Sequence, residues 1–457
     1  MPPEARLARR KHIDLTRPLR RNETRRLARI LQRVDDVQIA GQLDNLPPED
    51  QDRILQILPV ERRASVFAEL REETAAELVS RLAPEEVAVL LDDLDADDVA
   101  DILGRVDESR LRQILARLDP ADADEVEQLL GYDENTAGGI MSLDFICVFD
   151  NVTVAEAVRV VQQVDDPPDQ AFYVYVVDED ERLVGVVSLR GLLTSRPDEP
   201  IREVMEPELV YVDREADQEE VADVAMRYDL VAVPVVDEQR RLVGVVTIDD
   251  IVDVIREEAT EDILKMAGAG EELFETRSFW RSFRARMPWL AAAAVGGVVV
   301  AAALSGFEGA LQAVPILALF MPVIAGMGGN VGTQSSTIVV RGLAVGYVES
   351  ATLGRLVFRE MGLGAALGAL YGLLIAIAAP LIGSVVEDPI ALGAVLTLGM
   401  MGSMTIAATV GTCISLLMHR FKIDPAIATG PFVITSVDIL GLMFYFWLAT
   451  VLLDVSP

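Results

Sequence analysis

Apolar residues recur every twelve positions through the first third of the chain. The series runs from Leu46 and Leu58 to Leu118 without a change of phase, and pairs of apolar residues keep the same register between its members. Proline and carboxylates begin several units, as at Pro84, where the helix dipole favours negative charge. The pattern predicts short stacked helices that form an all-α solenoid over residues 25–130.

A duplicated segment of strand-like runs follows the helical repeat. Residues 173–178 (YVYVVD) return as residues 232–237 (AVPVVD), and residues 182–188 (RLVGVVS) return as residues 241–247 (RLVGVVT). Each copy opens with a methionine, which is Met141 in the first and Met205 in the second. Val and Ile runs that alternate with helical stretches indicate α/β modules.

This duplication resembles a tandem pair of CBS domains. The resemblance implies two modules, over residues 137–201 and 202–260, that pack together. It also implies a regulatory part of the protein, because such pairs in many proteins bind adenine nucleotides or ions, and it identifies no activity by itself.

Five apolar stretches follow Arg277, and each is long enough to cross a hydrocarbon core of about 30 Å. We place them at residues 287–307, 312–340, 360–383, 389–418 and 425–453. The fold class is therefore a multidomain membrane protein with a solenoid, an α/β CBS pair, a connecting helix near residues 250–275 and an all-α transmembrane domain over residues 277–457.

The loop charges predict the orientation of these spans. Arginines precede the first span and lie between the second and third, and basic residues also separate the fourth from the fifth. The alternate loops carry acids such as Glu308 and Asp388. By the positive-inside rule, we expect a multi-pass protein of the cell membrane with a cytoplasmic N-terminus and an external C-terminus. The polar, basic first thirty residues predict no cleavable signal peptide.

Charge is divided unequally between the two halves of the chain. The whole chain has a net charge of −33, but residues 277–457 carry 9 basic and 8 acidic groups, so almost all of the excess acid precedes them. Such an excess disfavours nucleic acid as a partner and favours cations. With only two cysteines, one in each half, and two histidines, the chain offers no thiolate site and no HExxH metal site.

Asp438 is the main candidate for chemistry inside the membrane. We expect it to be the only acidic residue well inside a span, and a charged group there costs several kcal/mol, which marks a functional site. Thr435 lies one helical turn earlier on the same side. Since Pro431, Thr435 and Gly441 interrupt an aliphatic run, we expect a broken helix whose carbonyl oxygens join the carboxylate as ligands for a hard cation. A protonated aspartate that only bonds a neighbouring helix is the alternative.

The second span is unusually polar and rich in glycine. Asn330 and Gln334 are four residues apart and share one helical face, where their amides can line a wet pathway or bond another helix. Thr405, Thr409 and Thr412 in the fourth span also recur at helical spacing, but threonine hydroxyls commonly bond their own backbone, so we assign these three to packing.

The whole arrangement resembles the MgtE family of magnesium transporters and channels. The most specific motifs are the segment from Pro322 to Gln334 and the segment from Asp424 through Gly430 and Pro431 to Asp438. The resemblance implies a homodimer in the lipid bilayer, with a pore between the second and fifth helices of the two subunits. It implies that Asp438 faces a hydrated Mg²⁺, beside pore-lining Asn330, Gln334, Thr435, Gly430 and Pro431. It implies no enzymatic activity.

The acidic half of the chain predicts a cation sensor. Acids share one side of the helix after the second CBS copy, and others on the solenoid and at the mouth of the fifth span could face them. When Mg²⁺ is scarce, repulsion between these carboxylates would hold the domains apart and let the pore open. When Mg²⁺ is abundant, bridging ions would draw the domains together and close the pore. The resemblance implies the same feedback and suggests ATP in the CBS pair. The regulatory candidates are Asp97, Asp98, Asp101, Asp250, Asp253, Glu257, Glu258, Glu261, Asp262 and Asp424.

Two other readings keep the same fold. The first is a transporter whose substrate is Co²⁺ or Mn²⁺, since an oxygen-lined site ranks these ions by hydration and size. The second is a nontransporting Mg²⁺ sensor that signals to a partner. An intramembrane protease is disfavoured because the spans lack a second aspartate and a Ser/His pair.

Overall fold

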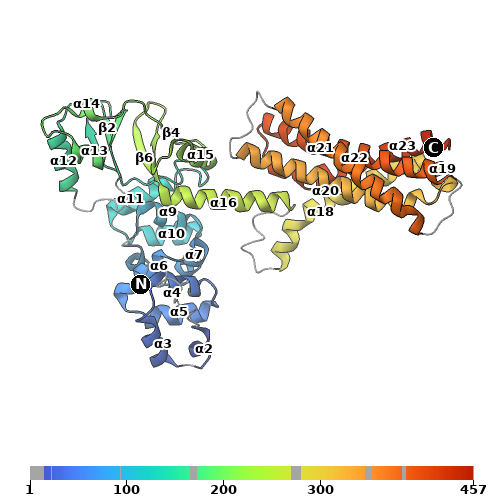
Figure 1. Cartoon of the computed structure of the whole chain (residues 1–457). Helices are drawn as coiled ribbons and strands as arrows, with labels where there is room; N and C mark the ends of the chain where they lie inside the picture. The colour runs from blue at the N-terminus through green and yellow to red at the C-terminus, as the bar shows by residue number, and fades with distance from the viewer. Residues whose placement is uncertain are drawn as a thin grey trace, which may run out of the picture. The chain divides into compact units, whose positions relative to one another are not determined.

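The computed structural model describes residues 15–21, 23–92, 94–164, 172–268, 279–344, 353–382 and 388–455. The chain divides into two compact units, Met1–Ile255 and Arg256–Pro457, and the division falls within the helix α16 (Ile248–Met266). Figure 1 shows the elements of both units.

The first unit begins with a stack of short helices. From α4 to α11 every helix starts twelve residues after the one before it, which confirms the predicted repeat. Contacts join alternate helices, such as α4 with α6, α6 with α8 and α7 with α9, so the helices stack in two rows. The helices are α2 (Thr16–Arg20), α3 (Thr24–Leu31), α4 (Asp36–Leu43), α5 (Pro48–Ile57), α6 (Val60–Ala68), α7 (Glu72–Arg81), α8 (Pro84–Leu91), α9 (Ala96–Gly104), α10 (Glu108–Leu115) and α11 (Pro120–Leu129).

The repeat places one helix start in every period. Pro48, Pro84 and Pro120 each occupy the first helical turn, where the missing N–H costs nothing. The Asp119 side chain accepts a hydrogen bond from the backbone N–H of Ala121 at 3.1 Å and caps α11. The recurring leucines, among them Leu58, are buried in one continuous core or partly buried against it.

Two three-stranded sheets form the rest of this unit. In both, the first strand pairs parallel with the second and the second pairs antiparallel with the third. The register shifts between Val176 and Val177 in one sheet and between Val235 and Val236 in the other, so the duplication extends to the same irregularity. The elements are β1 (Cys147–Phe149), α12 (Val154–Gln163), β2 (Tyr173–Val177), β3 (Leu183–Ser188), α13 (Leu189–Thr194), α14 (Ile201–Val204), β4 (Val212–Asp213), α15 (Gln218–Tyr228), β5 (Ala232–Val236) and β6 (Leu242–Thr247).

The opening segment of each copy packs on the sheet of the other copy. Met205 lies against Gly185 of the first sheet, and Met141 lies against Gly244 of the second, so closely that a Cβ on either glycine would clash with the methionine. Ser142 bridges to Val245 in the same way. Because each copy completes the other, the pair folds as one body with a shared core between the sheets.

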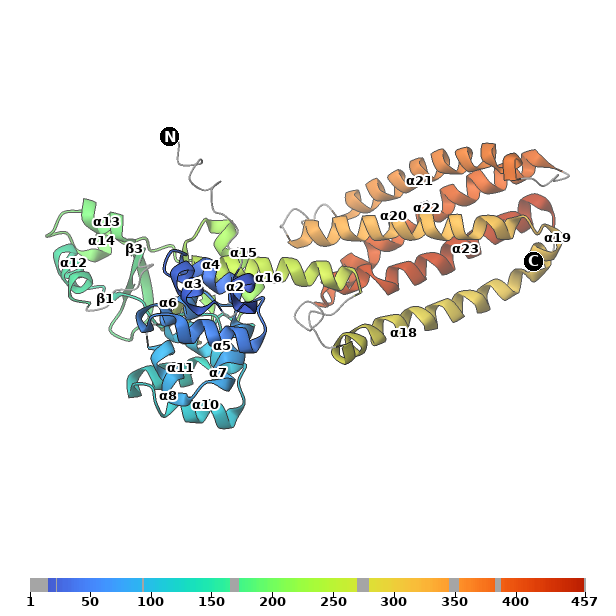
Figure 2. The same ribbon diagram turned by 90° about the horizontal axis from the view of Figure 1, so that it is seen from below.

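The second unit is a bundle of long helices. Figure 2 shows α20, α21, α22 and α23 running alongside one another, and contacts join α22 to each of the other three. The elements after α16 are α18 (Phe279–Leu304), η1 (Ser305–Phe307), α19 (Glu308–Ala313), α20 (Leu317–Ala344), α21 (Leu353–Ala378), η2 (Ala379–Ile382), α22 (Pro389–Arg420), η3 (Pro425–Thr429) and α23 (Pro431–Leu453).

Glycines allow α21 to approach α22 closely. A Cβ on Gly368 would lie 2.5 Å from the Met401 Cα, and one on Gly372 would lie 2.7 Å from the carbonyl oxygen of Thr397. Such small-residue stripes let helices associate in a membrane, where the hydrophobic effect does not drive them together. Thr405 and Thr409 donate to carbonyl oxygens of their own helix, as expected for residues that pack.

Among the described residues, four helical segments are long and apolar enough to cross a membrane: Ser282–Ala313, Leu353–Ala378, Pro389–Arg420 and Pro431–Leu453. The helix α20 has 28 residues, but its Gly, Asn, Thr, Gln and Ser content keeps it outside this set. The count of five spans therefore stays a prediction, and it depends on whether α20 faces other protein instead of lipid.

Candidate functional site

Asp438 lies half-buried in α23, two turns after the start of the helix. The chain enters this helix through η3 and Gly430, and Pro431 occupies the first turn. The break therefore precedes Asp438, and α23 runs without interruption from Pro431 to Leu453. Our expectation of an opened helix at Asp438 is wrong, because Pro431 sits where proline is tolerated and Thr435 fits the helix.

The polar segment of α20 packs against Val437, the residue before Asp438. Val437 lies against Gly328 and Gly332, where added Cβ atoms would be 3.1 and 3.0 Å from its methyl groups. These two glycines bracket Asn330 in the sequence, so α20 and α23 approach most closely at the level of the candidate pore residues. The glycines are needed for that approach.

Asn330 and Gln334 are exposed on a side of α20 that the described helices of the chain leave uncovered. Val323 and Ile338 extend the same exposed stripe. Thr435, by contrast, packs against Gly296 of α18, where an added Cβ would be 2.6 Å from its methyl group. The structure thus separates Thr435 from the uncovered stripe on α20.

A second acidic side chain, Glu360, is buried inside the bundle on α21, with an exposed fraction of 3%. The prediction that Asp438 is the only acidic residue well inside a span is therefore wrong. The predicted third span began at residue 360, whereas α21 begins at Leu353, so Glu360 lies within the helix instead of at its end. Because Arg359 directly precedes Glu360, the pair looks in the sequence like the charged end of a loop.

The first unit gathers four of the regulatory candidates. Burial and then Glu72 raise the pKa of Asp101 to about 8, and burial and then Asp97 raise the pKa of Asp250 to about 8. Asp98 is more exposed than these two, and its partial burial and then Asp97 raise its pKa to about 7. Burial likewise raises the pKa of Asp97 to about 6. Carboxylates of α9 thus face the first turn of α16, where a cation would relieve their repulsion.

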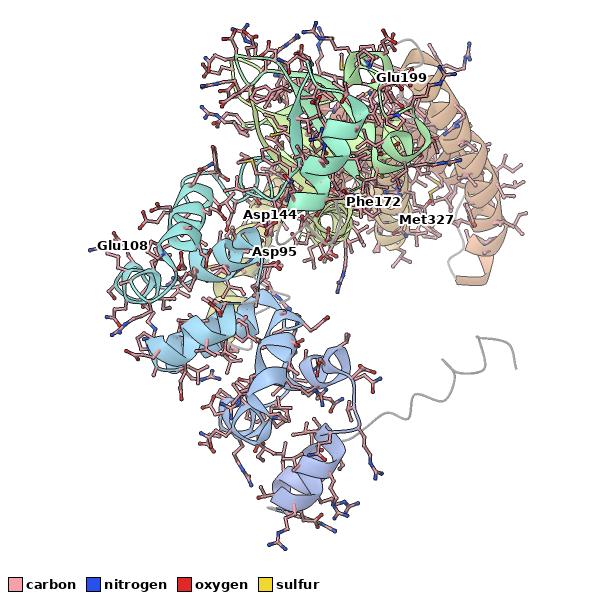
Figure 3. The ribbon with its side chains drawn as sticks, turned by 90° about the vertical axis from the view of Figure 1, so that its left-hand side faces the viewer. Asp95, Glu108, Asp144, Phe172, Glu199 and Met327 are labelled. Atoms are coloured by element: carbon pink, nitrogen blue, oxygen red, sulfur yellow. The ribbon has the colours of Figure 1, made fainter. Side chains whose placement is uncertain are left out.

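Three of these carboxylates, Asp97, Asp98 and Asp250, line a cavity of about 160 Å³. Asp95, Asp144 and Phe172, all labelled in Figure 3, are among the residues that line it. Within the described parts of the chain, no three acidic, histidine or cysteine side chains form a ready-made metal site. An arrangement of this kind suits Mg²⁺ held through its water shell, since Mg²⁺ loses water reluctantly.

The second unit holds another group of candidates around Lys265, a residue that the acidic pattern of α16 does not point to. Its ammonium lies 2.8 Å from an Asp424 carboxylate oxygen and also pairs with Glu261. Burial lowers the Lys265 pKa, but the bonds to Asp424 and Glu261 outweigh it and raise the pKa above its usual value. Burial and then Asp424 raise the pKa of Asp262.

The remaining candidates, Asp253, Glu257 and Glu258, also lie on α16. Asp253 and Glu257 are exposed, and Glu258 is half-buried. Their helical spacing is as expected, and their part in a sensor stays a prediction.

Family models match three parts of the chain. A divalent cation transporter domain, MgtE, matches residues 321–448, an MgtE intracellular N domain matches residues 34–135, and CBS domains match residues 137–198 and 201–257. These segments coincide with the helical bundle, the helical stack and the two sheets.

Relatives that match about 70% of the chain are magnesium transporters. The chain is 38% identical over 326 residues to the magnesium transporter MgtE of Bacillus subtilis (strain 168), with 71% of each chain covered. It is also 38% identical over 337 residues to that of Thermus thermophilus, with 72% of this chain and 73% of the relative covered. A crystal structure of the cytosolic domain of the Mg²⁺ channel MgtE in complex with ATP is 37% identical and covers 53% of this chain and 99% of that one, with a TM-score of 0.49.

Proposed function

Because the chain belongs to the MgtE family, we propose that it carries Mg²⁺ across the cell membrane and that cytoplasmic Mg²⁺ closes it. The family is one of transporters, so we assign no enzymatic activity. The observation that carries the proposal is Asp438, a half-buried carboxylate in a membrane helix, at the level where the glycine-rich segment of α20 meets α23. A charge in that position is costly unless a cation compensates it.

The uncovered stripe on α20 supports a homodimer. Asn330 and Gln334 present amides on a face that no other described helix of the chain covers, and amides facing lipid would leave their hydrogen bonds unmade. A second copy related by two-fold symmetry would place two such stripes opposite one another and enclose a polar path. We propose that Asp438, Asn330 and Gln334 of both copies, with Gly430 and Pro431 at the entrance, surround the hydrated ion.

Thr435 has a different role in this proposal. Since its side chain packs on Gly296 of α18, it reaches the ion path only if α18 moves away on assembly. We therefore keep Thr435 as a residue of the pathway wall that supports Asp438 one turn away.

The carboxylates form the sensor. When Mg²⁺ is scarce, repulsion among Asp97, Asp98, Asp101 and Asp250 opposes the packing of α9 on α16, and a bound ion removes that repulsion. The group around Lys265 extends the same control to the start of α23 through Asp424. The exposed acids Asp253, Glu257 and Glu258, together with Glu261 and Asp262, complete the proposed set.

Two further features belong to the proposal. The CBS pair supports ATP as a regulatory ligand, since such pairs bind adenine nucleotides in many proteins. The distribution of basic residues around the spans supports a cytoplasmic N-terminus and an external C-terminus in a multi-pass protein.

Flux measurements test the ion path. The full chain is reconstituted in liposomes, and Mg²⁺ entry is followed with an enclosed Mg²⁺-sensitive dye for wild type, Asp438→Ala and Asp388→Asn. Asp388 caps α22 through bonds to the N–H groups of Ile390 and Ala391, and asparagine can cap equally well, so this variant is the matched control.

We expect Mg²⁺ entry in wild type and Asp388→Asn and its loss in Asp438→Ala. Normal entry through Asp438→Ala would remove Asp438 from the path. If Co²⁺ or Mn²⁺ enters faster than Mg²⁺, that ion replaces Mg²⁺ as the proposed substrate. If wild type moves no divalent ion, only the nontransporting sensor remains as a proposal.

A further inference from the structure

Glu360 is a buried carboxylate that the proposed ion path does not use. It lies two turns inside α21, and its exposed fraction is 3%. Burying a carboxylate in a membrane helix is costly unless its oxygens are bonded, so its presence calls for a specific partner.

Both oxygens of Glu360 have partners. The Ser335 hydroxyl of α20 donates to Oε2 at 3.0 Å, and the Arg359 guanidinium donates to Oε1 at 3.1 Å. Ser335 is itself 3% exposed, whereas the Arg359 side chain is 61% exposed. The carboxylate acts as an acceptor in both bonds, and the bond to Ser335 is the one that joins two helices.

Ser335 follows Gln334, one of the two amides on the uncovered stripe of α20. The next residue, Ser336, shares a buried hydrogen bond of 2.7 Å with Ser415 of α22. Consecutive residues therefore fasten α20 to α21 on one side and to α22 on the other. A helix held at both positions cannot rotate or slide without breaking a buried bond, and the Gln334 amide is kept at a fixed depth and angle.

We propose that Glu360 is a positioning residue for cation transport, acting through Ser335 to hold the Gln334 stripe of α20 in the ion path. The inference rests on the proposed transport activity, and it adds a residue on α21 that touches no ion. Its effect is on the geometry of α20, so it predicts altered ion preference as well as altered rate.

The test measures Mg²⁺ entry against Mg²⁺ concentration, and the ratio of Co²⁺ to Mg²⁺ entry, for the reconstituted full chain. The variants are Ser335→Ala, Glu360→Ala, the double variant and Glu360→Gln. Thr409→Ala is the control, because it also removes a membrane hydroxyl, but one that bonds only its own helix. Elution as a single species in size-exclusion chromatography establishes that each variant is folded.

We expect Ser335→Ala and Glu360→Ala each to raise the KM for Mg²⁺ about tenfold and to shift the Co²⁺ to Mg²⁺ ratio, which matches the loss of one charge-assisted hydrogen bond. The double variant should be no worse than either single variant, since both remove the same bond. Glu360→Gln still offers a carbonyl oxygen to Ser335 and should stay within about twofold of wild type, as should Thr409→Ala.

Unchanged kinetics and ion preference in Ser335→Ala overturn the inference. This variant remains informative even if Glu360→Ala does not fold, because Glu360 keeps Arg359 as its partner. Impairment of Glu360→Gln equal to that of Glu360→Ala also overturns it, because the charge and not the bond would then matter. Absence of flux in wild type overturns the proposed function itself, which separates the two failures.

Discussion

The carboxylates of α9 and α16 predict that stability depends on pH and Mg²⁺ together. The pKa of Asp250 is raised from its ordinary value of 3.8 to about 8, and that of Asp101 also to about 8. The folded protein therefore binds more protons than the unfolded chain between about pH 4 and pH 8. Without Mg²⁺, stability is greatest at the acidic end of that window and falls as the pH rises through it.

Asp250→Asn is the perturbation that isolates this effect. One pKa unit corresponds to about 1.4 kcal/mol, and the full shift of Asp250 sets an upper limit of about 6 kcal/mol. Several carboxylates share the repulsion and Asp250 is partly open to water, so we expect this one substitution to recover about 1–2 kcal/mol of stability at pH 9. For a unit of this size that is about 2–8 °C in Tm.

The assay is thermal unfolding of the full chain in detergent at pH 6 and pH 9, with EDTA or with millimolar Mg²⁺. In EDTA, wild type should lose Tm between pH 6 and pH 9 by more than Asp250→Asn does. Mg²⁺ should restore more Tm at pH 9, where protons no longer compete for the carboxylates. Asp229→Asn is the control, because Asp229 caps α15 in a left-handed conformation that asparagine also tolerates.

Equal Tm values of wild type at the two pH values in EDTA would refute the reasoning. So would an identical loss of Tm in wild type and Asp250→Asn, since the raised pKa of Asp250 would then not contribute to the pH dependence.

Two more predictions follow from helix contacts in the second unit. Gly368→Ala should lower the Tm of the full chain by an amount corresponding to about 1–3 kcal/mol, because the new Cβ would meet the backbone of Met401. Gly297→Ala is the control and should leave the Tm unchanged, because its Cβ would meet nothing within 4 Å. Equal Tm values for the two variants would contradict the close approach of α21 to α22. Lys265→Met should lower the free energy of unfolding in EDTA by no more than about 1 kcal/mol, and it should enlarge the rise in Tm that Mg²⁺ causes, since Asp424 loses its cation. An unchanged rise in Tm with Mg²⁺ would mean that this group binds no ion.

Repeats and duplications were readable from the sequence because they repeat a physical requirement. Each unit of the solenoid needs a helix start and a buried face, so prolines such as Pro84 and leucines such as Leu58 recur at the period of the helices. The paired sheets follow from the same logic, although the exchange that packs Met141 on Gly244 depends on tertiary contacts that a pattern of residues does not encode.

The candidate sites were less predictable because they depend on which helix faces which. Asp438 stands out because apolar residues surround it, whereas Glu360 follows an arginine and is easily assigned to a loop. Lys265 was overlooked because helical spacing predicts which acids share a face of α16 but not that a cation lies among them. Likewise, the contact of Thr435 with Gly296 was hidden, because spacing along α23 says nothing about α18.

If the acidic half closes a Mg²⁺ path when cytoplasmic Mg²⁺ is abundant, Mg²⁺ entry must depend on the Mg²⁺ concentration on the side of that half. The direct measurement is Mg²⁺ entry into liposomes that hold the full chain, while Mg²⁺ on the side of the CBS pair is raised from micromolar to millimolar levels at a fixed gradient. We expect rapid entry at the low level and steep suppression at the high level. Entry that does not depend on Mg²⁺ on that side would show that the acidic half does not control the path.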